Sequence, residues 1–283
     1  MSATTVAGLA AEILSAAQGH HKGTIGTLGA AIATTTETTI TLAGNSGAHK
    51  GQSLGIDSEI MQITSVSGQT ATVIRGTGGS TPAAHADGER IYLDWRWQLY
   101  NVEQAMADEI RSWPYELFSV GSEALSIVST SVSYPMTATD FRFALMMELD
   151  TGDTYGRTPL VKGDIRQNAA GLKLQLENAI PAGTLTVMYA ADFDTSTFVG
   201  ATALTTVGIE ERLHDVVRYG VLGRLLDLRE PERSQRGSQP DPREAEETRV
   251  LDTARQAQAL KARRDLRIEE EIERLRNRWP IRF

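Results

Sequence analysis

The last segment of the chain, a helical stretch from about Arg243 to Trp279, limits most strongly how the chain can fold. It is highly charged, and its apolar residues form only a thin stripe: Ala254, Ala257, Leu260, Ile268, Ile272, Leu275 and Trp279. A helix of some 35 residues extends roughly 50 Å at 1.5 Å per residue. Because so few large apolar side chains give it little to bury against a monomer core, we expect this helix to depend on neighbouring chains.

The end of this helix is locally basic although the chain as a whole has a net charge of -8. The basic segment runs from Lys261 to Arg282, and the chain ends in the motif WPIRF, residues 279–283. Large apolar groups at a terminus usually indicate docking onto a partner, and a disordered end is the alternative. The sequence predicts Trp279, Ile281 and Phe283 as apolar anchors and Arg274, Arg276, Arg278 and Arg282 as their charge partners.

Helical and strand-like segments alternate along the rest of the chain. Apolar residues spaced for a helix occur from Val6 to Ala17 and again from Trp95 to Trp113, whereas short runs rich in β-branched residues lie between and after them. The predicted fold class is α+β, a helical bundle with a long C-terminal helix and two antiparallel β domains, a small barrel or sandwich and a larger β-sandwich. The predicted domains are an N-terminal helix (1–30), a small β domain (31–94), a helix of the helical core (95–116), a β-sandwich (117–207) and the C-terminal helices with a docking tail (208–283).

Composition excludes several classes of function. The chain has no cysteine, which excludes disulfides, thiolate nucleophiles and cysteine-ligated metals. An acidic net charge argues against a broad surface for gripping nucleic acid, because neutralising phosphates supplies most of that affinity. No stretch approaches the roughly 20 apolar residues of a membrane-spanning helix.

A glycine-rich loop with a single histidine is the one segment that invites a catalytic interpretation. The sequence VIRGTGGSTPAAHADGERIY, from Val73 to Tyr92, lacks the lysine of a phosphate-binding loop and precedes a strand-like run, so we expect a hairpin excursion. No constellation of serine, cysteine or carboxylate at a recognisable spacing accompanies His85, which predicts that it packs in the loop or forms a hydrogen bond to the backbone. His20 and His21 lack a third metal ligand at a recognisable spacing. From these observations together we expect no catalytic, cofactor-binding or metal-binding residue.

The segment from Glu59 to Leu93 resembles one that recurs in virion proteins of tailed bacteriophages. The shared pattern is an E-I strand, a V-S-G turn, a strand ending in R-G, then T-x-A-A-H-x-x-G and a last strand. The matching residues are Arg75, Gly76, Thr81, Ala83, Ala84, His85 and Gly88. The resemblance implies that these are structural positions of a β module.

The order of helices and β segments is similar to that of head-to-tail adaptor proteins, also called connector or head-completion proteins. This resemblance implies a non-enzymatic homo-oligomer, usually a dodecameric ring, in the neck of the virion and assembled in the host cytoplasm. The ring would lie below the portal protein, dock to it through C-terminal segments and meet a downstream neck or tail protein, such as a stopper or tail terminator. DNA would pass through the lumen without specific binding, since an acidic wall repels phosphate.

Two other interpretations remain open from the sequence. A minor tail or fibre-associated phage protein would share the β module but form a trimer or bind host surfaces. A carbohydrate-active enzyme with β-sandwich accessories would need paired carboxylates about 5 to 10 Å apart in a cleft.

Overall fold

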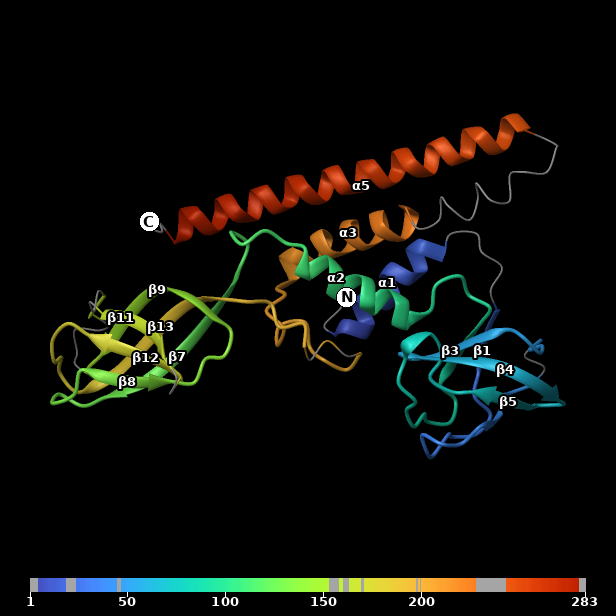
Figure 1. Ribbon diagram of the computed structural model, residues 1–283, viewed down its shortest axis with the longest axis horizontal. Helices are drawn as coiled ribbons and strands as arrows, with labels where there is room; N and C mark the ends of the chain where they lie inside the picture. Colours follow the sequence, from blue (N-terminus) through green and yellow to red (C-terminus); the bar gives the residue numbers. More distant parts are fainter. Residues whose placement is uncertain are drawn as a thin grey trace. The chain divides into compact units, whose positions relative to one another are not determined.

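The computed structural model describes residues 5–18, 24–44, 47–152, 158–159, 163–168, 171–196, 198, 200–227 and 243–279 (Figure 1). The chain divides into two compact units, which are described separately. The first unit takes the residues up to Ser112 together with Thr195–Arg267. The second takes Trp113–Asp194 and the end of the last helix from Ile268 onward.

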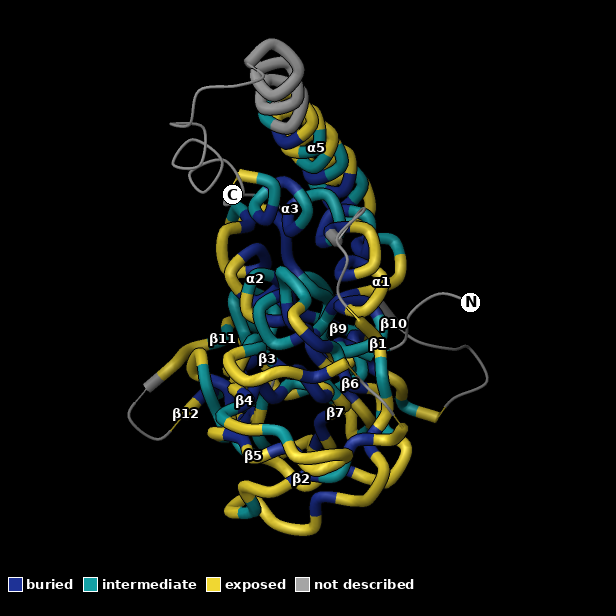
Figure 2. The backbone as a smooth tube through the Cα atoms, turned by 90° about the vertical axis from the view of Figure 1, so that its right-hand side faces the viewer, coloured by how far each residue is buried: buried dark blue, intermediate teal, exposed yellow. Residues whose placement is uncertain are grey.

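Three helices form much of the first unit: α1 (Val6–Gln18), α2 (Leu99–Arg111) and α3 (His214–Asp227). Each of them contacts the other two. Apolar residues recur at intervals of three and four along α1 and α2, which places them on one face of each helix. Those faces are buried, as the dark blue stretches in Figure 2 show, and they include Leu9, Ile13, Leu14, Val102, Met106 and Ile110.

Helix α2 begins later than the sequence predicted. Trp95 and Trp97 precede it, because Gln98 has an extended backbone and its N–H donates a hydrogen bond to Asn101 Oδ1 at 3.1 Å. At the other end Ser112 closes the helix, and its hydroxyl donates to the carbonyl of Glu109 at 2.7 Å. Side chain–backbone bonds of this kind satisfy polar groups that a helix end leaves unpaired.

The long helix α5 (Arg243–Arg278) matches the predicted bounds to within one residue. Within the first unit it packs against α3, where Ala257 is fully buried and a Cβ added at Gly223 would lie 3.2 Å from Lys261 Cγ. The Lys261 side chain of α5 thus lies over Gly223 of α3. This part of α5 is therefore supported by its own chain, and the dependence of the helix on neighbouring chains stays a prediction.

Residues between the first two helices form a six-stranded antiparallel sheet in the order β1-β6-β3-β4-β5-β2. The strands are β1 (Thr24–Thr27), β2 (Thr39–Thr41), β3 (Ser53–Ile56), β4 (Glu59–Ser67), β5 (Thr70–Ile74) and β6 (Arg90–Leu93). Alternate side chains point to one core, which includes Leu54, Ile56, Met61, Ile63, Val73 and Ile91. Leu28, directly after edge strand β1, and Leu42, directly after edge strand β2, form an isolated antiparallel β-bridge with each other.

The second unit contains two further antiparallel sheets, of four strands (β10-β9-β13-β7) and of three (β11-β12-β8). Their strands are β7 (Ser119–Ile127), β8 (Ser133–Met136), β9 (Phe141–Asp150), β10 (Thr158–Pro159), β11 (Gly163–Asn168), β12 (Gly171–Leu176) and β13 (Gly183–Ala191). Both sheets contribute to one core, for which Leu174 comes from the smaller sheet and Leu185 and Val187 from the larger. The fold is thus mixed α+β with antiparallel sheets and a C-terminal helix, as the sequence predicted.

Candidate functional site

The glycine-rich loop does not form the predicted hairpin. Strand β5, before the loop, pairs with β2 and β4, whereas β6, after it, pairs with β1 and β3. The loop therefore passes from one side of the β3–β4 hairpin to the other. Tight hairpin turns need only two to five residues, and this longer connection instead covers the end of the hairpin.

Glu59, the first residue of β4, is the centre of the polar contacts beneath this loop. Its side chain is fully buried and its carboxylate accepts hydrogen bonds from Arg75 Nε at 2.6 Å and Nη2 at 2.7 Å. The backbone N–H groups of Gly76 and Ala83 also donate to it, at 3.2 and 3.0 Å. A buried carboxylate is tolerated only when it is paired in this way, so Glu59 holds the start and the middle of the loop against the sheet.

The other guanidinium hydrogens of Arg75 bind backbone carbonyls. Nη1 donates to the carbonyls of Thr34 and Glu37, each at 3.1 Å, and Nη2 also donates to that of Ala83. The planar fork of arginine supplies these several donors at once, which a lysine could not do. Arg75 thus connects the segment before β2 to the loop after β5.

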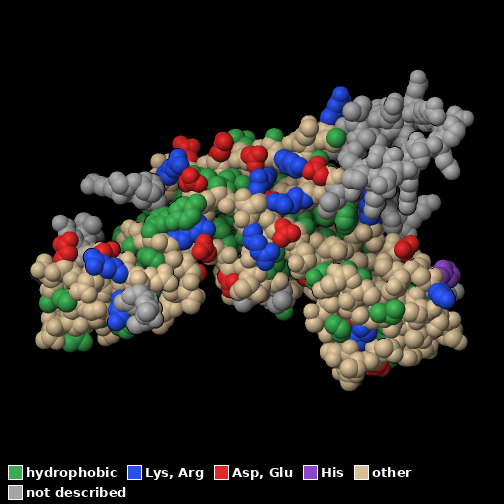
Figure 3. All heavy atoms as spheres, viewed as in Figure 1, with side chains coloured by type: hydrophobic (Ala, Val, Ile, Leu, Met, Phe, Trp, Pro, Cys, Tyr) green, Lys and Arg blue, Asp and Glu red, His purple; other side chains and the backbone are tan. Residues whose placement is uncertain are grey.

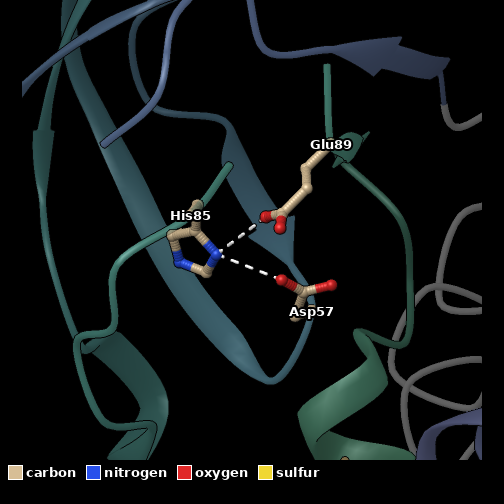
Figure 4. Close-up of side chains that lie close together, drawn as sticks. All are labelled: Asp57, His85 and Glu89. Atoms are coloured by element: carbon tan, nitrogen blue, oxygen red, sulfur yellow. Dashed lines mark hydrogen bonds and ion pairs between the residues drawn. The ribbon is translucent and has the colours of Figure 1, made fainter. Parts of the chain in front are cut away.

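His85 lies in the loop with both ring nitrogens next to carboxylates. Nε2 is 3.0 Å from Glu59 Oε2, while Nδ1 is 3.1 Å from Asp57 Oδ2 and 3.2 Å from Glu89 Oε2. Figure 4 shows Asp57 and Glu89 converging on that one ring nitrogen. The expectation that no carboxylates accompany His85 is wrong, because Asp57 and Glu59 come from the neighbouring hairpin and only the fold brings them close.

Burial and hydrogen bonding act in opposite directions on this cluster. Burial alone would raise the pKa of Glu59, but hydrogen bonds from Arg75, the Ala83 N–H and His85 hold it below its ordinary value. Burial would lower the pKa of His85, yet hydrogen bonds to Asp57 and Glu59 raise it. The hydrogen bond from His85 is also the largest cause of the lowered pKa of Asp57. The cluster therefore favours ionised carboxylates around a positive charge.

The remaining residues of the predicted β module serve the shape of the loop. Gly76 and Gly88 have positive φ angles of 63° and 78°, and a Cβ on Gly76 would lie 2.9 Å from Pro82 Cδ. Glycine reaches this backbone region at little cost, so both positions suit it. Thr81 and Ala84 are exposed, and the geometry assigns their side chains no specific part in the cluster.

The predicted portal-binding residues fall at the end of α5, in the second unit. Arg274 pairs with Glu271 of the same helix at 2.8 Å, and the Arg278 guanidinium lies 5.4 Å from the centre of the Trp279 ring. Arg276 is exposed and lines an open hollow of about 470 Å³ together with Glu116, Glu269, Ile272 and Glu273. Ile281, Arg282 and Phe283 lie outside the described residues.

A second buried polar cluster was missed in the sequence. Glu109 of α2 is buried and forms ion pairs with Arg224 of α3 and Arg264 of α5. Both arginines also donate to the hydroxyl of Ser112, at 2.8 and 3.0 Å. Glu109 lies on the inward face of its helix, where an acidic residue is unusual. Its place in the apolar spacing was the sequence signal that could have indicated a buried ion pair.

No helix among the described residues is long and apolar enough to cross a membrane. Comparison of the chain with models of known protein families gives no match. Comparison with curated proteins likewise gives no significant match.

Proposed function

We propose that the chain is a structural virion protein, the head-to-tail adaptor of a tailed bacteriophage. In this proposal, identical subunits form a ring, a dodecamer, below the portal and continue the DNA channel to the tail. The protein has no enzymatic role, and its direct partners are the portal protein and a downstream neck or tail protein. The virion neck is the proposed location, after assembly in the host cytoplasm.

The end of α5 is the observation that carries the proposal. Trp279 is only half-buried and follows the exposed Arg276 and Arg278, and the sequence continues directly into Ile281 and Phe283. Exposed aromatic and arginine side chains are the types most enriched in the centres of protein interfaces. This segment is therefore the proposed contact with the portal.

The outer face of α5 fits a position beside another subunit. Side chains of both charges are interspersed along it, as Figure 3 shows, and Leu266 is 57% exposed among them. A polar face with an isolated apolar residue suits the rim of an interface rather than a buried core. The proposal assigns this face to contacts between neighbouring subunits of the ring.

The buried Glu59–Arg75–His85 cluster supports a structural role for the residues that match the phage β module. Each of the three side chains is used to hold the loop on the sheet, which leaves Arg75 committed to internal contacts. In the proposal, the six-stranded sheet is a small barrel and the β7–β13 region a β-sandwich. Both β domains then decorate the ring or face the next tail component.

Reconstitution with the portal encoded by the same genome tests the proposal. Negative-stain microscopy and mass measurement of the full chain, alone and with purified portal rings, should reveal twelvefold rings seated on the portal. A chain ending at Arg278 should bind the portal at least about tenfold more weakly, because it lacks the proposed aromatic anchors. An Arg166→Ala variant, altered at an exposed arginine of the second unit, is the matched control and should bind normally.

The possible results separate the proposals. Unchanged portal binding by the shortened chain would reject the docking segment. A stable trimer without affinity for the portal would reject the adaptor and favour the minor tail or fibre-associated protein. A gene order without a portal or capsid gene nearby would also count against the adaptor.

A further inference from the structure

Three potential metal ligands from two segments converge in the first unit. They are Nδ1 of His85 and one carboxylate oxygen each of Asp57 and Glu89, and all three atoms lie within 4.8 Å of one another. The nitrogen is 3.1 Å from the Asp57 oxygen and 3.2 Å from the Glu89 oxygen. Ligands bound to one zinc ion at about 2.1 Å are themselves separated by about 3.0–3.5 Å, so the two nitrogen–oxygen spacings need little adjustment.

The buried side of the histidine ring fixes which nitrogen faces the carboxylates. Nε2 lies 3.0 Å from the carboxylate of Glu59, which is fully buried and held in place by Arg75. Nε2 therefore donates its proton to Glu59, and Nδ1 is the nitrogen whose lone pair, once its own proton is displaced, is directed at an ion between Asp57 and Glu89. Carboxylate, histidine and metal in this order is the usual arrangement of a histidine ligand and its outer partner.

Without a metal ion, a proton on Nδ1 separates the two carboxylate oxygens, in agreement with the raised pKa of His85. A proton on Nδ1 can be donated well to only one of the two carboxylate oxygens, since a single N–H points in one direction. A metal ion at the centre contacts all three atoms. The arrangement in Figure 4, with both carboxylates directed at the same nitrogen, therefore lets a metal ion displace that proton and contact all three atoms.

The backbone holds the ligands in place independently of their side chains. Asp57 occupies the turn between β3 and β4 with a positive φ of 47°, a conformation that aspartate tolerates better than most residues. The backbone of His85 is paired with Ile32, through hydrogen bonds of 2.8 and 2.9 Å. Two of the three ligands thus lie at anchored positions, which lowers the entropic cost of binding an ion.

The site is also accessible from solvent. The side chain of His85 is only 2% exposed, whereas those of Asp57 and Glu89 are 62% and 31% exposed. An ion can enter between the carboxylates, and water can complete its coordination. Three protein ligands with one open position are compatible with the four-coordinate geometry of zinc.

We propose that His85, Asp57 and Glu89 bind a divalent transition-metal ion of the zinc type. The imidazole ligand favours Zn²⁺ over Ca²⁺ and Mg²⁺, which prefer sites made only of oxygen atoms. The bound ion joins the β3–β4 turn to the loop between β5 and β6. Its role is to lock the β module, independently of the proposed place of the chain in a virion.

Calorimetric titration with ZnCl₂ tests the proposal directly. The full chain is used without a histidine tag and carries His20→Gln and His21→Gln, which removes the only adjacent pair of histidines in the sequence. We expect saturable binding of one Zn²⁺ per chain and much weaker binding of Ca²⁺. Asp57→Asn should weaken Zn²⁺ binding at least about tenfold, the lower end of the effect of losing an outer partner.

Asp87→Asn is the matched control, because Asp87 is an exposed carboxylate of the same loop that does not belong to the cluster. This variant should bind Zn²⁺ as the parent does. In long-range ¹H–¹⁵N spectra, Zn²⁺ should shift Nδ1 of His85 while Nε2 keeps its proton. Absence of saturable binding, equal affinity of the two variants or an unchanged Nδ1 signal at saturation would each overturn the proposal.

Discussion

Arg264 of α5 donates a hydrogen bond to the buried carboxylate of Glu109 in α2, across 155 positions of sequence. Arg224 of α3 binds the other oxygen of the same carboxylate at 2.7 Å. One acidic side chain thus connects three helices of the first unit. Because removing a buried partner leaves the remaining charges uncompensated, the stability of this unit depends on it.

Replacing Glu109 by Gln should destabilise the first unit. We expect a loss of about 2–4 kcal/mol in the free energy of unfolding, at the lower end because Arg224 is 37% exposed. Urea unfolding measures this change. Asp108→Asn, which affects an exposed pair with Arg111, should cost less than about 1 kcal/mol. Equal losses in the two variants would show that Glu109 does not join the helices.

Two glycines of α3 should respond in opposite ways to substitution by alanine. At Gly220 a new Cβ would lie 2.3 Å from the Glu109 carboxyl carbon, so Gly220→Ala should cost about 1–3 kcal/mol. At Gly223 the nearest atom, 3.2 Å away, belongs to the flexible Lys261 side chain. That side chain can move, so Gly223→Ala should be neutral or gain up to about 1 kcal/mol from helix propensity. Thermal unfolding of both variants checks the contrast, which equal shifts would contradict.

Arg75 should not be replaceable by lysine. Lysine keeps the positive charge but cannot bind both Glu59 oxygens and the backbone carbonyls at once, so Arg75→Lys should cost about 2–3 kcal/mol in the free energy of unfolding. Arg90→Lys, at an exposed position of β6, is the matched control and should change stability by less than about 0.5 kcal/mol. Chemical denaturation measures both variants, and similar values would show that the fork geometry of Arg75 is unimportant.

His214 should make the protein less stable in acid. Burial lowers its pKa below the ordinary value of 6.5, against a smaller opposing effect of Glu211. The unfolded chain therefore takes up a proton that the folded chain resists, so the stability that His214 contributes is full above pH 6.5 and lost as the pH falls. Urea unfolding between about pH 7 and about pH 5 should show a smaller loss for His214→Gln than for the unchanged chain. Identical losses would contradict the prediction.

Much of the helical architecture could be predicted from the sequence, because the apolar spacing of α1 and the bounds of α5 are local properties. The inward position of Gly220 and Gly223 could not be predicted, because a glycine carries no apolar signal. The effect of a substitution there depends on which side chains the fold places against the glycine. Helix α2 was predicted to begin at Trp95 because its aromatic residues continue the spacing, whereas the cap at Gln98 is a matter of backbone geometry.

The candidate site shows the same limit. The turn glycines Gly76 and Gly88 could be predicted from the loop, but which strands pair across a long connection cannot be inferred from their composition. Asp57 and Glu59 precede His85 by more than 25 positions and reach it only through the β3–β4 hairpin. Glu89, four residues after His85, was the one nearby signal in the sequence.

Because Glu109 joins three helices that are far apart in the sequence, the helices can assemble fully only late in translation. The core of the six-stranded sheet is built entirely from residues between Leu28 and Val73 and from Ile91 and Leu93, so it is complete before α2 has been synthesised. Arg264 follows Glu109 by 155 residues, a delay of about 8–30 s at usual rates of translation. The β module can thus fold while Glu109 still waits for Arg264, the later of its two arginine partners to be synthesised.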